Sequence, residues 1–300
     1  MEHKKLLFIM NPRSGTMQAA KLLSDIIQIF NEAGYMVTVL MTQARNDAKK
    51  WAKQYAAEYD TIVVSGGDGT FNELVDGILD SGNHPTIGYI PAGSTNDFAI
   101  SLGLPRTIQE AARRVVEGTA SDLDIGSFNG RHFSYVASFG AFTSTSYSVP
   151  QNLKNILGHS AYMLSGVKEL VNIKPIHAKI TADPGTPNEM VAEGDYLFGA
   201  ICNCTSIAGV LKLDKMDVDM NDGLMEVFLI KMPKDLIEIN SIITKVLAND
   251  LNSKEIMFFS GKNIYVEIDE GTHWTLDGEY EEGAGKVEIK TLQSAIKIIR

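Results

Sequence analysis

The sequence predicts an N-terminal α/β domain built on a parallel sheet, followed by an antiparallel, mostly β domain. Before Asp122, short apolar runs alternate with amphipathic helical patterns, which is typical of a parallel sheet with helices on both faces. Beyond Asp122, strand patterns follow one another with turn signals between them. The length of 300 residues is consistent with two domains and allows a sizeable core without disulfides.

The N-terminal half consists of strand patterns that are each followed by a helical pattern. The strand patterns are short apolar or β-branched runs, and the helical patterns repeat apolar residues every three or four positions. Phe71, Leu74 and Ile78 share one helical face in this way. The expected strands are 6–10, 35–41, 61–65 and 86–90, and the expected helices are 17–33, 47–59, 71–79 and 107–117.

The C-terminal half is rich in strand patterns. Asn129-Gly130 lies between the apolar runs 125–128 and 132–139, which is a strong hairpin signal. Residues 153–173 and 235–248 are expected to be helical. The other expected strands are 176–182, 190–204, 222–230, 256–260, 263–269, 272–277, 285–291 and 295–299. No low-complexity linker separates the halves, so we expect two closely packed domains with a cleft between them.

Charge and cysteine content exclude several classes of protein. The chain has 27 Lys and Arg against 37 Asp and Glu, a net charge of −10, so we expect no general nucleic-acid binding. Cys202 and Cys204 form a CxC pattern, which fits a reducing compartment and gives no zinc framework. The sequence has no Walker A motif, no dinucleotide fingerprint after a strand and no H-E-x-x-H.

Targeting signals are also missing from the sequence. No apolar run approaches the ~18 residues of a membrane-spanning helix. The apolar run 6–10 is too short for a signal-peptide core and ends at Asn11-Pro12. We therefore expect a cytoplasmic location.

The most informative segment is the glycine-rich turn Gly66-Gly67-Asp68-Gly69-Thr70, between a buried strand and an amphipathic helix. Glycines allow positive φ and let a ligand approach the main-chain amides. The N-terminus of a helix offers unpaired N–H groups and a positive dipole end, which suit phosphate. A carboxylate beside phosphates fits a bridging divalent cation. The alternative for these five residues is an ordinary tight turn with Asp68 or Thr70 as a helix cap.

Two further strand ends carry similar turns. The first strand ends in Asn11-Pro12-Arg13-Ser14-Gly15, and the fourth in the run from Pro91 to Phe98. In a parallel sheet the carboxyl ends of the strands lie at one edge, where ligands bind. We therefore expect the three turns to converge on one site.

These turns resemble those of the bacterial diacylglycerol kinase family of soluble lipid kinases. The resemblance rests on Asn11-Pro12-x-Ser14-Gly15, Gly66-Gly67-Asp68-Gly69-Thr70-x-Asn72-Glu73 and Gly93-Ser94-Thr95-Asn96-Asp97-Phe98-Ala99. It continues through Asp122-Leu123-Asp124-Ile125-Gly126, Gly158-x-x-Ala161-Tyr162, Asp222-Gly223 and Asp277-Gly278-Glu279. GGDGT alone also resembles NAD kinases, but the other two turns make the resemblance to lipid kinases specific.

The resemblance implies an α/β ATP-binding domain over residues 1–125 and a β-sandwich lipid-substrate domain over 126–292, with ATP in the cleft. The last strand, about 293–300, returns to the first domain. The implied product is phosphatidate, made from diacylglycerol and ATP. The residues that would hold ATP are Asn11, Pro12, Arg13, Ser14, Gly15, Thr42, Gly66, Gly67, Asp68, Gly69, Thr70, Phe71, Asn72 and Thr95.

The resemblance also implies the catalytic groups. Asp68, with Asp97, would organise a Mg²⁺–phosphate network, and Glu279 would act as general base on the lipid hydroxyl. A carboxylate there can take the proton as the new bond forms. From the residues alone, Asp277-Gly278 is equally a hairpin turn that leaves Glu279 exposed.

A second acidic cluster contains Asp214, Asp217 and Asp219. Its glycine, Gly223, falls one position too late for an EF-hand loop, so we expect no calcium sensor. The resemblance implies a structural Mg²⁺ held by Asp217 and by carbonyls of Asp214 and Asp219. The alternative is a solvated acidic loop.

Several departures and alternatives stay open at this point. Thr16 occupies a position that is often lysine or arginine in the family, and His159 one where lysine is common. Between 151 and 182 there are four lysines and one acid, interspersed with apolar residues, so this segment either contacts anionic lipid at the inner membrane surface or is an ordinary amphipathic helix.

The rival functions are an NAD kinase-like enzyme and a non-catalytic nucleotide-binding regulator. The accepted lipid and the oligomeric state, a homodimer included, are not readable from the sequence.

Overall fold

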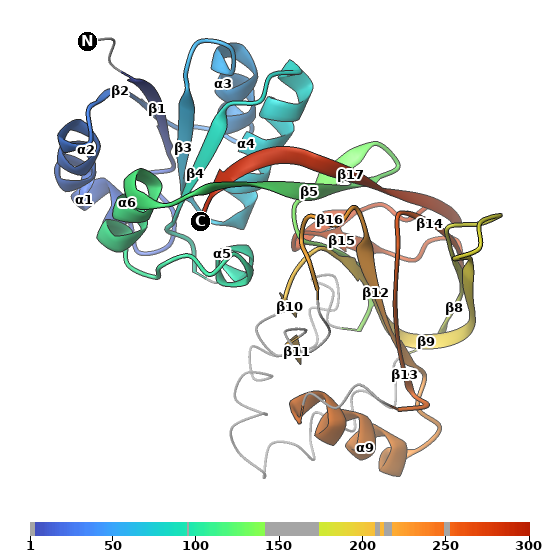
Figure 1. Ribbon diagram of the computed structural model, residues 1–300. Coiled ribbons are helices and arrows are strands. Elements are labelled where there is room, and N and C mark those ends of the chain that lie inside the picture. Colours follow the sequence, from blue (N-terminus) through green and yellow to red (C-terminus); the bar gives the residue numbers. More distant parts are fainter. Residues whose placement is uncertain (1–3, 95, 142–173, 208–210, 213–217, 249–252) are drawn as a thin grey trace. The chain divides into compact units, whose positions relative to one another are not determined.

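The computed structural model describes residues 4–94, 96–141, 174–207, 211–212, 218–248 and 253–300 (Figure 1). It divides into two compact units. Unit 1 comprises Met1–Ile125, Met220–Asp222 and Leu292–Arg300, and unit 2 comprises Gly126–Asp219 and Gly223–Thr291. Strands β5 (Ala120–Phe128) and β17 (Lys286–Ile299) contribute residues to both units.

Unit 1 contains a parallel sheet. Its strands run in the order β2–β1–β3–β4, with the end of β17 parallel to β4. In register, Met10 lies opposite Ser65, and Ser65 lies opposite Ile90, so the strands end level with one another. The new strands here are β1 (Lys4–Met10), β2 (Tyr35–Met41), β3 (Thr61–Gly66) and β4 (Thr86–Pro91).

Helices cover both faces of this sheet, as the alternating pattern predicts (Figure 1). Buried side chains of α1 (Gln18–Lys21), α2 (Leu23–Glu32) and α6 (Ile108–Glu117) form one core with β1 and β3. On the other side of the strands, α3 (Asp47–Tyr55) packs on α4 (Asp68–Ser81). A Cβ on Gly77 would lie 2.2 Å from the carbonyl oxygen of Lys49, so only glycine allows this close approach of the two helices.

Two expected helices differ from the structure. The helix expected over 17–33 is interrupted at Leu22, and Met17 has a left-handed φ of 58°. The apolar period runs through the interruption, so periodicity alone does not reveal it. The helix expected over 47–59 ends at Tyr55. A further short helix, α5 (Asp97–Ser101), follows the fourth strand and has no counterpart in the sequence-based prediction.

Unit 2 is antiparallel and strand-rich, as predicted. Its strands run in the order β16–β15–β7–β9–β8–β14–β17, and β12 lies between β9 and β13. Inward-facing side chains of these strands form one core, in which Trp274 packs edge-on against Phe128 and at a tilt against Phe139. The strands are β7 (Val136–Gly140), β8 (Ile176–Ala182), β9 (Met190–Cys202), β12 (Met225–Lys231), β13 (Ile256–Gly261), β14 (Asn263–Ile268), β15 (Trp274–Leu276) and β16 (Glu279–Glu281).

The predicted hairpin at Asn129-Gly130 is confirmed. Both residues have positive φ, 47° and 90°, and they join β5 to β6 (Arg131–Phe133). The run expected as one strand over 132–139 is divided between β6 and β7, whereas the two runs 285–291 and 295–299 form the single strand β17.

The helix expected near 235–248 is also confirmed, as α9 (Leu236–Leu247). The Asp235 carboxylate caps it by accepting hydrogen bonds from the N–H groups of Ile237 and Glu238. A small pair of strands, β10 (Ser206–Ile207) and β11 (Leu211–Lys212), was not predicted. The helix expected over 153–173 lies outside the described residues. Among the residues described, no helix combines the length and apolar character needed to cross a bilayer.

Candidate active site

The three predicted turns of unit 1 meet at the carboxyl edge of the parallel sheet. The N–H of Asn11 donates to the carbonyl of Ser65 at 2.8 Å, and the N–H of Ala92 donates to the carbonyl of Gly66 at 2.7 Å. The side-chain amide of Asn11 also donates to Oγ1 of Thr70 at 3.2 Å. Hydrogen bonds between neighbouring turns therefore hold the three strand ends in one cluster.

Glycines allow the main chains of these turns to touch. Gly15 has a positive φ of 51°, and a Cβ there would lie 2.3 Å from the carbonyl oxygen of Ala92. A Cβ on Gly93 would lie 2.6 Å from Cα of Gly67. Contacts this short exclude any side chain, so the cluster presents main-chain atoms at these points.

Asp68 is the first residue of α4, and Gly67 is its N-cap. No side chain caps this helix, although the N–H of Thr70 already donates to the carbonyl of Gly67 at 3.0 Å. The amides at the very start of such a helix are the ones that an anionic ligand can bind. The 14-residue helix adds the positive end of its dipole. This is the arrangement expected of a phosphate-binding strand–turn–helix.

The Asp68 carboxylate lies among polar partners and one other charge. Its Oδ2 accepts a hydrogen bond from the N–H of Asp97 at 3.2 Å, and the buried Tyr89 hydroxyl lies 3.5 Å from its Oδ1. Burial raises the pKa of the Asp68 carboxyl, and the nearby charge of Asp97 raises it further. Burial and the Asp68 charge also raise the pKa of Tyr89 well above its usual value. A cation at this position would relieve the repulsion between the two carboxylates.

Other predicted ligand residues of unit 1 surround this cluster. The N–H of Thr42, just after β2, donates to the carbonyl of Met10 at 2.9 Å, which places it beside the end of β1. Asn72 and Phe71 are buried on α4. Arg13 donates its N–H to the side-chain oxygen of Asn11 at 3.0 Å. Thr95 lies outside the described residues.

The sequence alone assigned no role to two residues of this cluster, although one of them, Asn96, lies within a predicted turn. The Asn96 side chain accepts from the N–H of Gly93 at 2.9 Å and donates to its carbonyl at 3.0 Å, which closes the fourth-strand turn. Tyr89 supports Asp68 and packs on Phe71, with ring centroids 4.7 Å apart. The Gly-Ser-x-Asn spacing is a sequence signal for the turn at Asn96. Tyr89 lies within an apolar strand pattern, and nothing in the sequence around it indicates a contact with Asp68.

In unit 2, Glu279 begins β16 directly after a tight turn. Asp277 and Gly278 both have positive φ, 51° and 83°, so Asp277-Gly278 is a hairpin turn. The buried Asp277 carboxylate accepts hydrogen bonds from the N–H groups of Ser134, Tyr135 and Val136. This turn is therefore fixed to the segment between β6 and β7.

The side chain of Glu279 is paired with Arg131 of β6. Nη2 of Arg131 donates to Oε2 of Glu279 at 3.0 Å, and Nη1 donates to Oε2 of Glu281. The Glu279 side chain is 37% exposed. Glu279 thus keeps access to solvent while one of its oxygens is held by a guanidinium.

The predicted acidic metal loop is largely outside the described residues, which include Asp219 but not Asp214 or Asp217. Asp219 is exposed. Within the described residues, no group of three or more His, Cys, Asp or Glu side chains is arranged to hold a metal ion. The structural Mg²⁺ site therefore stays a prediction.

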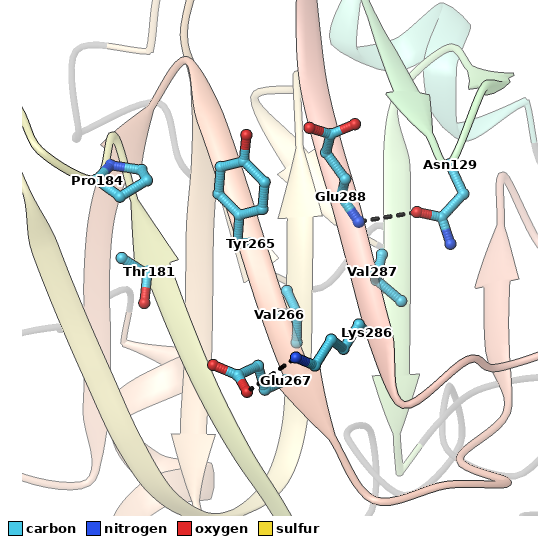
Figure 2. Close-up of a pocket in the computed structure, with 9 residues that line it drawn as sticks. All are labelled: Asn129, Thr181, Pro184, Tyr265, Val266, Glu267, Lys286, Val287 and Glu288. Atoms are coloured by element: carbon cyan, nitrogen blue, oxygen red, sulfur yellow. Dashed lines mark hydrogen bonds and ion pairs between the residues drawn. The ribbon is translucent and has the colours of Figure 1, made fainter.

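A shallow pocket of about 390 Å³ lies on the strands β8, β14 and β17 of unit 2 (Figure 2). Its charged groups are already paired: Nζ of Lys286 lies 3.9 Å from Oε2 of Glu267, and Oε2 of Glu288 lies 2.8 Å from Nζ of Lys290. The main-chain N–H of Glu288 also donates to Asn129 at 2.8 Å. None of the predicted site residues lines this pocket. We therefore do not assign the active site to it.

Comparison with known proteins agrees with the geometry of unit 1. A family model described as "Diacylglycerol kinase catalytic domain" matches residues 5–128. The diacylglycerol kinase of Bacillus subtilis is 36% identical over 280 residues, which cover 92% of this chain and 90% of that protein. The diacylglycerol kinase of Staphylococcus aureus strain MRSA252 is 32% identical over 279 residues, covering 92% of this chain and 86% of that protein.

Solved structures are similar along the whole chain. A diacylglycerol kinase structure from Bacillus anthracis strain Sterne superposes with a TM-score of 0.76 at 25% identity, covering 100% of this chain and 97% of that one. Another chain from the same organism superposes with a TM-score of 0.80 at 27% identity, covering 100% and 96%. The similarity therefore extends over both units.

Proposed function

This chain belongs to the diacylglycerol kinase family, and we propose that it transfers the γ-phosphoryl group of ATP to the free hydroxyl of diacylglycerol, giving phosphatidate and ADP. The observation that carries the proposal is the cluster of three turns at the carboxyl edge of the unit 1 sheet. The edge of a parallel sheet is where ligands of this fold class bind. Unit 1 would then be the ATP-binding domain and unit 2 the lipid-substrate domain.

The turn cluster is suited to the phosphates of ATP. Gly15, Gly67 and Gly93 let the main chains of the turns approach one another closely. Glycine-rich turns of this kind allow phosphates to reach main-chain amides. The uncapped start of α4 adds further N–H donors. Asn11 to Gly15, Thr42, Gly66 to Asn72 and Thr95 are the residues that we propose to hold ATP.

The carboxylates of Asp68 and Asp97 are suited to Mg²⁺. Oxygen ligands are the ones that Mg²⁺ prefers, and it is usually bound through one or two carboxylates together with substrate phosphates. The raised pKa of Asp68 supports this, since an unneutralised carboxylate pair is unfavourable there. When bound, the cation would neutralise charge that develops on the transferred phosphoryl group.

We assign the general base to Glu279 in unit 2. A lipid alcohol is hard to deprotonate in advance, so a carboxylate that takes the proton during transfer accelerates the reaction. Glu279 is partly exposed and follows a rigid turn, which suits a group that must meet an incoming hydroxyl. In phosphoryl transfer, most of the rate enhancement that a general base does not supply comes from positioning of the reactants and neutralisation of charge.

A lipid substrate requires contact with a bilayer, and we propose that this contact is peripheral. The lysines between 151 and 182 supply a local positive charge within an acidic chain. Sedimentation with anionic liposomes would test this, with Lys154, Lys168 and Lys174 replaced by glutamate. Unchanged binding by the triple variant would contradict the role of this segment.

The acceptor is tested by measuring ADP release with diacylglycerol micelles, with NAD, or with neither. We expect release that depends on diacylglycerol. Release that depends on NAD would favour an NAD kinase-like enzyme, which the relatives do not support. ATP binding without release under any condition would instead indicate a nucleotide-binding regulator.

A further inference from the structure

We infer that Arg131 is a positioning residue for Glu279: its guanidinium holds the carboxylate in the orientation that receives the proton of the lipid hydroxyl. The inference deepens the proposed function and rests on the assignment of Glu279 as general base. It is carried by the contact between Nη2 of Arg131 and Oε2 of Glu279 at 3.0 Å. These residues are 148 positions apart in the sequence.

Hydrogen bonds made by Asp277 hold the main chain next to Glu279 in place. Asp277 accepts three main-chain N–H groups from Ser134, Tyr135 and Val136, and its own N–H donates to the carbonyl of Val136 at 2.8 Å. Arg131 belongs to β6, the strand that leads into this same segment. The Asp277 contacts therefore set the distance between β6 and β16.

A glutamate on a fixed strand still has three rotatable side-chain bonds, so a rigid main chain alone leaves its carboxylate free to move. Residues two apart in a strand point to the same side, which brings Glu281 beside Glu279. Arg131 contacts both, with Nη2 on Glu279 and Nη1 on Glu281. The planar fork of an arginine can hold two carboxylates in fixed directions, which a lysine cannot do equally well.

The exposure of these side chains favours an orienting role over a stabilising one. The side chains of Arg131 and Glu279 are 34% and 37% exposed. Ion pairs with this much solvent access contribute little to folding stability. The same contact can matter for turnover, because misplacing a reacting group by about 1 Å can lower the rate roughly 100-fold.

Substitution of Arg131 in the full-length protein tests the inference. We expect Arg131→Gln to lower kcat on diacylglycerol micelles by about 10- to 100-fold, with the KM for ATP and the thermal midpoint unchanged. Arg131→Lys should recover part of kcat, since one ammonium can still hold one carboxylate. Adding Glu281→Gln to Arg131→Lys should recover more, because the ammonium then has a single partner. Lys286→Gln, which removes an exposed ion pair with Glu267 elsewhere in unit 2, is the matched control and should leave kcat unchanged.

Normal turnover in Arg131→Gln, alongside an inactive Glu279→Ala, would overturn the positioning role and leave the proposed function standing. Turnover in Glu279→Ala itself would overturn the base assignment and this inference together. A structural role would instead be indicated by a clear fall in the thermal midpoint of Arg131→Gln. A loss of ATP affinity by the same factor as the loss of kcat would indicate it as well. If Arg131→Gln does not fold, Arg131→Lys and its double variant decide, and equal turnover in both would overturn the inference.

Discussion

The N–H of Asp97 donates a hydrogen bond to Oδ2 of Asp68 at 3.2 Å, which joins the start of α5 to the start of α4. Each of these residues opens a helix that follows a parallel strand. Burial raises the pKa of the Asp68 carboxyl, and repulsion from the nearby Asp97 carboxylate raises it further. Such an arrangement stores an unfavourable charge where a cation and phosphates are expected to bind.

The first prediction concerns Asp68→Asn, which should abolish turnover and raise the thermal midpoint of the ligand-free protein. The amide removes a charge whose burial is unfavourable, while its oxygen can still accept the N–H of Asp97. A gain of ~1 kcal/mol would raise the midpoint of a 300-residue chain by roughly 1.5–2 °C. Scanning calorimetry without ATP measures this.

The pH dependence of that difference has a definite sign. A carboxyl whose folded-state pKa is raised weakens folding at a pH above that pKa, and this effect disappears as the pH falls below the unfolded value of about 3.9. The midpoints of the parent and Asp68→Asn should therefore converge as the pH is lowered. A variant that is less stable than the parent at pH 7 would contradict the account.

Gly93→Ala should weaken ATP binding and destabilise the protein by about 1–3 kcal/mol. The new Cβ would lie 2.6 Å from Cα of Gly67, so the third- and fourth-strand turns must separate. Gly194→Ala is a suitable control, since the new Cβ would lie 4.0 Å from the Tyr196 hydroxyl, its nearest neighbour. Calorimetric titration with ATP measures the affinity, and equal affinities in both variants would argue against the turn cluster as the phosphate site.

Glu279→Ala should lower turnover by about 10²- to 10⁴-fold, the usual contribution of a general base. ATP should bind as in the parent, because Glu279 belongs to unit 2 and is not among the residues proposed to hold ATP. Glu282→Ala, three residues further along and exposed, is the control. Near-normal turnover in Glu279→Ala would remove the catalytic role.

Asp277→Ala should destabilise the protein by about 2–5 kcal/mol, since three buried N–H groups lose a charged acceptor. Asp269→Ala is the comparison, because Asp269 accepts one main-chain N–H, from His177, in an exposed turn. Urea unfolding at neutral pH measures both. Similar losses in the two variants would show that the Asp277 contacts are not what holds the β15–β16 turn.

Asp217→Ala should lose a bound divalent cation that the parent retains after dialysis. The resemblance to the family implies that this carboxylate is a direct ligand, and removing one ligand weakens a hard-cation site. Elemental analysis of both proteins, with Asp195→Asn as a control, measures the metal content. An equal metal content in the parent and in Asp217→Ala would contradict the metal site and favour a solvated acidic loop.

Most of the fold could be predicted because its elements carry local signals. Strands β1 to β4 are short apolar runs bounded by turn residues, and α4 has a clear apolar period. Helix α5 has five residues, too few for a period to be recognised. Strand β16 is short and polar, and only its pairing with β15 makes it a strand.

The site shows the same division between local and tertiary signals. The turns at Asn11, Asp68 and Asn96 could be found because glycine and small polar residues follow each strand directly. The contact of Arg131 with Glu279 joins residues 148 positions apart, and no local pattern indicates it. Tyr89 reads as an apolar strand residue, and its contact with Asp68 follows from the packing of β4 against α4.

Transfer of label from ATP to lipid is the decisive test of kinase activity in this chain. The protein is incubated with diacylglycerol micelles, Mg²⁺ and ATP labelled either at the γ- or at the α-phosphorus, and the lipid is then extracted. We expect label in phosphatidate from γ-labelled ATP and none from α-labelled ATP, and no label from either ATP with Asp68→Asn. If the lipid fraction stays unlabelled with the folded parent protein, diacylglycerol kinase activity is contradicted. Label that appears in NADP when NAD is supplied would contradict it too.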